Sequence, residues 1–186
     1  MAESYRREFD ELSALAEKQL QHPEGRLPRY QRLFRIWRYP SFEPYVSTMI
    51  FAPVQPHAKF DLPLVVEVKW DRPFDVMRFH DPMKGLAHGF LPAPTMSVKE
   101  GELLPDELAL RIANLEKLQV PLVLDRTVGV DGEHSGFETF GCGSAVRITW
   151  WSIMPPAWQP IVEWSKEMQE FLSAALERKS PAINAI

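Results

Sequence analysis

The segment from Trp150 to Trp158 constrains the fold most, because it fixes where a strand ends and a helix begins. An apolar, β-branched pattern precedes this segment and an amphipathic helical pattern follows it. Proline fits a helix only in the first turn, where amide hydrogens have no intrahelical acceptor. Because Pro160 lies inside the helical pattern, the closing helix must begin at about Pro156 or Ala157.

The tryptophans of this segment are expected to divide between two environments. Side chains alternate between the faces of a strand, so an inward Trp150 turns Trp151 outward. We expect Trp150 and Trp158 to lie in the core. Trp151 is then either covered by another element or available as an anchor for a partner, and we favour coverage.

Three amphipathic helices are predicted. Apolar residues spaced three and four apart indicate a helix from about Tyr5 to Gln21. Pro105 followed by two acidic residues is typical of a helix start, and this helix runs to about Gln119. The closing helix runs to about Arg178. Its inward stripe is predicted to contain Trp158, Ile161, Val162, Ser165, Met168 and Leu172, widened by Trp164 and Phe171.

Six short segments rich in β-branched and aromatic residues predict strands. They cover residues 31–39, 46–52, 62–70, 120–124, 137–141 and 145–151. The first three form a meander in the simplest topology, and the last two form a hairpin around Gly143-Ser144. The third strand alternates in its side chains, so we expect it to bury one face.

The region from Asp71 to Gly101 is predicted to be largely irregular. Asp71 to Asp75 indicates the start of a short helix, but repeated prolines and glycines interrupt any longer pattern. Irregular regions of more than about 15 residues are uncommon in compact domains and often carry function. We therefore expect a binding surface here, and the alternative is that the region covers a sheet edge.

These elements predict a single α+β domain over residues 1–178. It consists of an antiparallel sheet of about six strands, with N-terminal, central and C-terminal helices packed on it. A chain of 186 residues can bury a sizeable core without a disulfide or a metal. Residues 179–186 are expected to form a frayed tail.

The sequence favours a cytoplasmic protein. Cys142 is the single cysteine, so no internal disulfide can form, and the charged N-terminal residues do not resemble a secretory signal. No run of about 18 apolar residues is present, so no membrane-spanning helix is predicted.

The histidines do not form a recognisable catalytic or metal-binding pattern. His80, Asp81 and His88 lie in the irregular region, but their spacing matches no zinc motif and only one cysteine exists. The sequence therefore predicts no metal, no cofactor and no catalytic residue. We retain His80 and His88 as candidate contacts to a partner.

Cys142 lies between two glycines, which could expose its thiol to a base such as His134. No neighbouring residue supplies the positive charge that stabilises a thiolate, so a small residue in a hairpin turn is the better interpretation. His134-Ser135 without an identified acid is a weaker catalytic pattern still.

The strongest charge feature is a series of arginines at three-residue spacing. Its members are Arg26, Arg29, Arg32, Arg35 and Arg38. Residues 26–38 carry +5 and the remainder of the chain −9, and three aromatic residues interleave with the arginines. Arginine with aromatics is typical of single-strand nucleic-acid binding. A strand over 31–39 would instead send successive arginines to opposite faces, and the acidic character of the whole chain argues against nucleic acid. An acidic protein partner would fit this basic series equally well.

The C-terminal half has a specific order of elements: a helix, a short apolar strand, Asp-Gly, an aromatic residue, Trp-Trp, a proline and a third tryptophan. The residues are Leu108 to Leu118, Val120 to Leu124, Asp131-Gly132, Phe137, Trp150-Trp151, Pro155 and Trp158. Over residues 104–176 this order resembles an uncharacterised family of small bacterial α+β proteins, although Ser135-Gly136 lengthens the hairpin. Some of these proteins resemble immunity-type partners of bacterial toxins, so the resemblance implies a non-enzymatic protein.

The leading hypothesis is a non-enzymatic protein that binds a protein partner. Its candidate contacts are Arg29, Arg32, Arg35, Trp151, His80 and His88. One alternative is a small hydrolase-like enzyme, which requires His80, Asp81, His88 or His134 to converge in one pocket. The other is single-strand nucleic-acid binding through the series from Arg26 to Arg38.

Overall fold

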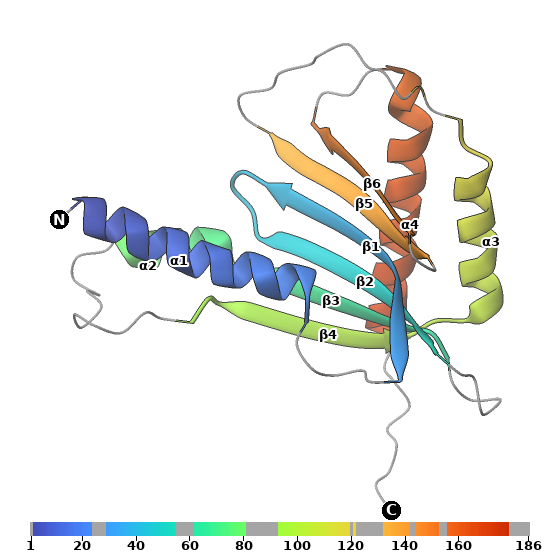
Figure 1. The fold of residues 1–186 in the computed structure, drawn as a ribbon, viewed down its shortest axis with the longest axis horizontal. Coiled ribbons are helices and arrows are strands. Elements are labelled where there is room, and N and C mark those ends of the chain that lie inside the picture. Colours follow the sequence, from blue (N-terminus) through green and yellow to red (C-terminus); the bar gives the residue numbers. More distant parts are fainter. Residues whose placement is uncertain are drawn as a thin grey trace, which may run out of the picture.

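The computed structural model of the chain describes residues 2–23, 29–54, 62–80, 93–119, 121, 132–141, 144–152 and 156–178. In these residues six antiparallel strands form one sheet that has helices on both faces (Figure 1). The strands are β1 (Tyr30–Pro40), β2 (Tyr45–Pro53), β3 (Leu64–Trp70), β4 (Met96–Glu102), β5 (Glu133–Gly141) and β6 (Ser144–Trp151). The helices are α1 (Ala2–Gln21), α2 (Arg72–His80), α3 (Pro105–Glu116) and α4 (Gln159–Glu177). The predicted α+β fold is confirmed.

The strand order of the sheet is β4-β3-β2-β1-β5-β6. Strands β1 to β4 follow one another as a meander, which confirms the meander predicted for the first three. The chain then returns past α3, and the β5–β6 hairpin pairs with the other side of β1. Strand β1 is therefore central, and β4 and β6 are the two edge strands.

The prediction for the region from Asp71 to Gly101 is correct at its start and wrong at its end. The short helix expected after Asp71 is present as α2, and Met96–Glu102 forms the edge strand β4. This strand has three charged residues and a glycine, so it has no apolar alternation. It forms because its backbone pairs with β3 along its whole length. Residues 81–92, which include Asp81 and His88, lie outside the described residues.

Two further predictions fall mostly outside the described residues. Of the strand expected at 120–124, only Pro121 is described, and it belongs to no strand. The sixth strand of the sheet is β4 instead. The tail at 179–186 is also outside the described residues.

Helices α3 and α4 cover one face of the sheet, which we call the α4 face. Trp164 of α4 packs edge-on against Phe34 of β1 and Phe137 of β5, with 5.5 Å between ring centroids in each pair. Its Nε1 donates a hydrogen bond of 2.9 Å to the backbone oxygen of Arg111 in α3. One side chain thus joins both helices to the centre of the sheet. The buried residues of α4 are Ile161, Trp164, Ser165, Met168, Phe171, Leu172 and Ala175, so most of the predicted stripe is confirmed. The prediction that Trp158 lies in the core is wrong, because this residue precedes α4 in the 3-10 turn and is not buried.

Helices α1 and α2 lie on the opposite face, over β2 and β3 (Figure 1). Leu12 and Leu20 of α1 are buried against Val66 and Val68 of β3. The expected burial of one face of β3 is confirmed for Val66, Val68 and Trp70, and Val65 is in addition fully buried in the core on the α4 face. The sequence pattern underestimated the burial because β3 lies between two strands and beneath helices on both sides.

A fully buried carboxylate fastens α2 and the start of β4 to the end of β3. Asp75 accepts hydrogen bonds from Trp70 Nε1 at 2.8 Å and from the backbone amide of Thr95 at 2.9 Å. The Thr95 hydroxyl donates to it at 2.7 Å, and Arg78 Nη2 lies 3.0 Å from it. Because all its partners are internal, this carboxylate has a structural role.

The closing helix begins where Pro160 requires it. A 3-10 turn at Pro156–Trp158 leads into α4, and Pro160 occupies the first helical turn. The predicted start is therefore confirmed. None of the described helices is long and apolar enough to cross a membrane.

Candidate functional site

The face of β1, β5 and β6 that points away from α4 is the main candidate surface, and we call it the open face. On this side α1 lies over β2 and β3, and no described helix covers β5 or β6 (Figure 1). The register of the strands places four residues from each on this face, in four rows. The rows are Tyr39, His134 and Trp151; Trp37, Gly136 and Thr149; Arg35, Glu138 and Arg147; and Arg32, Phe140 and Ala145.

A bulge in β1 decides which arginines lie on the open face. The register of β1 against β2 shifts between Arg32 and Phe34, because β1 advances by two residues there while β2 advances by one. Arg32 and Arg35 consequently share a face, although strict alternation would separate them. The prediction that a strand sends successive arginines to opposite faces is therefore wrong for this pair. It is correct for Arg38, which pairs with Glu43 and Glu133 instead.

Arg35 and Trp37 form the buried floor of the open face. Arg35 Nε donates to Ser47 Oγ at 2.9 Å and Nη2 donates to Tyr39 Oη at 2.6 Å. Its guanidinium lies 4.6 Å from the centre of the Trp37 ring, a cation–π contact. The Trp37 ring lies directly over Gly136, where a β-carbon would be 2.4 Å from Trp37 Cζ2. Gly136 therefore makes room for this ring.

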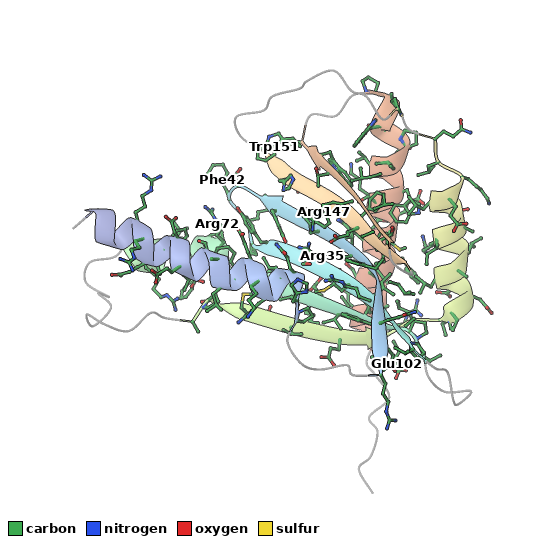
Figure 2. All side chains as sticks on the ribbon, in the orientation of Figure 1. Arg35, Phe42, Arg72, Glu102, Arg147 and Trp151 are labelled. Carbon is green, nitrogen blue, oxygen red and sulfur yellow. The ribbon has the colours of Figure 1, made fainter. Side chains whose placement is uncertain are left out.

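Glu138 lies between two arginines of the third row. Its Oε2 is 3.2 Å from Arg147 Nη2 and 3.9 Å from Arg35 Nη1. The Glu138 side chain is 13% exposed, whereas that of Arg147 is 53% exposed. Burial lowers the pKa of Arg35 from its usual value, while Tyr39 and Glu138 oppose that shift, and the guanidinium stays charged. Figure 2 shows Arg35 and Arg147 on this side of the sheet.

The open face has an excess of positive charge. Arg32, whose guanidinium lies 3.9 Å from the Phe140 ring centre, is the third cation in the four rows, and Glu138 supplies the single carboxylate in these rows. Burial lowers the pKa of the neighbouring His22, and the positive charges of Arg32 and Arg35 lower it further. Three guanidinium groups against one carboxylate leave a net attraction for anionic groups.

An aromatic row crosses the sheet at one end of the open face. Tyr39 and Tyr45 stack with 4.7 Å between ring centres, and Tyr45 packs edge-on against Trp70 at 5.4 Å. On the other side His134 lies 6.4 Å from Tyr39 and 5.9 Å from Trp151. Burial raises the pKa of Tyr39 and lowers that of His134. The row is thus core beneath α1 and becomes surface toward β6.

Trp151 ends this row, and its position agrees with the expected alternation. Trp150 packs toward the α4-face core, 6.4 Å from Phe137, and Trp151 lies on the open face. The ring of Trp151 is half-buried against His134. Its Nε1 is shielded from water and has no acceptor in the described part of the chain.

The tip of the β1–β2 hairpin presents an exposed aromatic residue beside this end of the face. Phe42 is 82% exposed, and Figure 2 shows it near Trp151. The tip is braced, because the Ser41 amide and hydroxyl both donate to the backbone oxygen of Gly132, at 3.1 and 2.7 Å. Gly132 has a φ of +154°, which favours glycine. An exposed aromatic side chain next to a braced backbone can serve as an anchor for a partner.

The structure brings together half of the candidate contacts named from the sequence. Arg32, Arg35 and Trp151 share the open face, although Arg35 is buried and serves its floor. Arg29 is exposed just before β1, where its backbone oxygen accepts from Val54. His80 ends α2 without a described side chain, and His88, like Cys142, is outside the described residues.

Sequence reasoning missed Glu138, Arg147 and Phe42. Arg147 and Trp151 are four residues apart on β6, so the two-residue period of the strand already places both on one face. The partnership of Glu138 with two arginines depends on strand order and register, which periodicity cannot supply. His134 and Ser135 are consecutive in β5 and so lie on opposite faces, which separates them as a catalytic pair.

The described residues contain no group of three or more His, Cys, Asp or Glu side chains that could hold a metal ion. No family model matches the chain, and no curated protein or solved structure is significantly similar to it.

Proposed function

We propose that this chain is a non-enzymatic binding protein that receives an acidic protein partner on its open face. The observation that carries the proposal is the excess of cations there: Arg35 and Arg147 flank Glu138, and Arg32 lies in the next row against Phe140. Such a face attracts carboxylates of a partner and steers their approach.

The floor and the rim of this face contribute in different ways. The floor is fixed before any partner arrives, because Arg35 is held by Ser47 and Tyr39. The rim offers exposed groups, chiefly Arg147 and Phe42. A preorganised floor reduces the ordering cost of binding, and a rim arginine with a nearby aromatic anchor is typical of protein interfaces.

Charge at the borders favours a protein over a nucleic acid. The cations occupy the two rows nearest the β5–β6 turn, whereas the carboxylate of Glu17 in α1 acts on Tyr39 at the aromatic row. A polyphosphate strand leaving the basic rows toward the aromatic row would meet this carboxylate. A protein partner can match both signs within one interface.

The resemblance of residues 104–176 to small bacterial proteins supports a narrower form of the proposal. In that form the partner is a bacterial toxin, the chain is its immunity-type partner, and both meet in the cytoplasm. This form rests on the sequence pattern, because the comparisons with known proteins returned no match.

The test is affinity purification from the native host with three tagged baits: the wild type, Arg147→Glu, and the matched control Arg178→Glu at the end of α4. Arg178 is also an exposed arginine and is paired with a glutamate, but it lies away from the open face. We expect one protein to be retained by the wild type and the control and lost from Arg147→Glu. For the purified pair, Arg147→Glu should weaken the affinity about tenfold or more, and added salt should weaken the wild-type affinity.

Two outcomes would contradict the proposal. Equal retention by Arg147→Glu and the wild type would remove the open face from binding. Tight binding of a labelled oligothymidine that depends on Arg32 and Arg147 would favour nucleic acid instead, with a steep dependence on salt.

A further inference from the structure

The two edge strands of the sheet differ in how well they are protected against pairing with another strand. Strand β4 carries Lys99, Glu100 and Glu102 with a glycine between them, which is a common device against edge-to-edge association. Strand β6 has one charged residue, Arg147, in eight, and its other residues are small, β-branched or aromatic. Its Val146 is 55% exposed. Such an edge is a template for strand addition.

We propose that β6 pairs with β6 of a second copy of this chain, antiparallel and about a two-fold axis at Ile148. The axis is perpendicular to the sheet, so each residue must face a residue from the same side of β6. With Ile148 opposite itself, three further pairs form on each side of the axis. These pairs are Ala145 with Trp151, Val146 with Trp150, and Arg147 with Thr149.

The side chains favour this register. Each tryptophan meets a small or β-branched residue, which suits the limited space between paired strands, and aromatic with β-branched pairs are favourable. Shifting the register by two residues toward the β5–β6 turn would set Arg147 opposite itself, which is unfavourable. In the chosen register each Arg147 faces Thr149 and keeps its own Glu138 at 3.2 Å. The local positive charge at the dimer axis is thereby reduced.

The dimer would join two open faces into one surface. The strand order becomes β1-β5-β6-β6-β5-β1 at the centre, with an α1 helix beyond each end of this platform. One open face offers three strands of four positions each, fewer than the 20–30 residues that a standard interface uses on each side. Two faces together reach that size. The dimer rests on the β6 edge alone, whereas its use as a platform rests on the proposed function.

The oligomeric state of the purified full chain tests the dimer without any partner. We expect sedimentation equilibrium to report a monomer–dimer equilibrium with dimer present at about 0.1 mM chain. The variant Val146→Lys/Thr149→Lys places cations on the exposed edge of β6 and should raise the dimer dissociation constant at least about tenfold. The matched control Ser97→Lys, on the exposed edge strand β4, should leave the dissociation constant unchanged.

Disulfide trapping tests the register. In a Cys142→Ser background, Ile148→Cys should form a covalent dimer under mild oxidation, because position 148 faces itself. Val146→Cys faces Trp150 of the second copy and should link much more slowly. A thermal melt of each variant confirms that it is folded.

Three outcomes would overturn the inference: a wild type that remains monomeric at about 0.1 mM, a dimer that Ser97→Lys weakens as much as the β6 lysines do, or equal cross-linking at positions 146 and 148. Failure of the dimer leaves the partner experiment intact, because that experiment depends on Arg147 in a single copy.

Discussion

The sharpest single test of the open face is the substitution Gly136→Ala. A β-carbon at this position would lie 2.4 Å from Trp37 Cζ2 and 2.6 Å from the backbone oxygen of Ile148. The first contact requires the indole to move, and the second comes from a backbone atom of β6 that is held by strand pairing with β5. Both distances are well below ordinary van der Waals contact, so the added methyl group must shift the floor of the open face.

The magnitude follows from the packing. Inserting a methyl group into a packed site costs typically about 1–3 kcal/mol, and we expect about 2 kcal/mol here because one contact is with backbone. For a domain of this size that corresponds to a fall in Tm of roughly 4–8 °C. Displacing Trp37 also removes the ring beneath the Arg35 guanidinium, so binding of a partner should weaken together with stability.

The assay is urea unfolding followed by tryptophan fluorescence, which gives the free energy of unfolding of each variant. The control is Gly141→Ala, an exposed strand glycine whose φ is not positive, and we expect it to change stability by less than about 0.5 kcal/mol. If Gly136→Ala were as stable as Gly141→Ala, the indole would not be confined over Gly136 and the described floor would be wrong.

Three further predictions concern the rest of the molecule. Asp75→Ala should lower the free energy of unfolding in urea by about 3–5 kcal/mol, because it leaves buried donors and Arg78 without their acceptor. Asp71→Ala, the control, loses one exposed amide contact and should cost about 1 kcal/mol. Equal costs would contradict the structural role of Asp75. Burial lowers the pKa of His134 below 6.5, so the unfolded chain binds this proton at a higher pH than the folded chain does, and the free energy of unfolding should fall as the pH drops below about 6.5. In a series of unfolding measurements at decreasing pH, His134→Gln should lose less stability than the wild type. Parallel plots of unfolding free energy against pH for the two proteins would refute this. Phe42→Ser should leave the free energy of unfolding within about 0.5 kcal/mol of the wild type, since the ring is 82% exposed, yet weaken binding of the purified partner; unchanged affinity would remove Phe42 from the interface.

Local patterns predicted those elements whose signals are contained in a short segment. The start of α4 follows from Pro160, whose ring and missing amide hydrogen exclude it from later helical turns. The stripe of α3 and the β5–β6 hairpin also follow from spacing and turn residues, and both are present. The alternation of Trp150 and Trp151 needed only the pleat of a strand.

Other features required partners that are distant in the sequence. Strand β4 has no apolar alternation, and it forms because its backbone pairs with the backbone of β3. Glu138 meets Arg35 only because the β5–β6 hairpin returns to pair with β1, about a hundred residues after it in the chain. The aromatic row from Trp151 to Trp70 likewise combines side chains from five strands.

The sequence by itself determined the α+β class, most of the helices and strands, and the alternation that puts Arg147 and Trp151 on one side of β6, because these depend on steric and hydrophobic preferences between near neighbours. Tertiary structure decided that a bulge puts Arg32 beside Arg35, that Glu138 lies between Arg35 and Arg147, and that α1 leaves β5 and β6 open. The physical reason is that strand order and register are chosen by the free energy of the whole sheet and its helices. A one-residue shift in register exchanges the two faces of a strand, so the composition of the open face is a property of the assembled sheet.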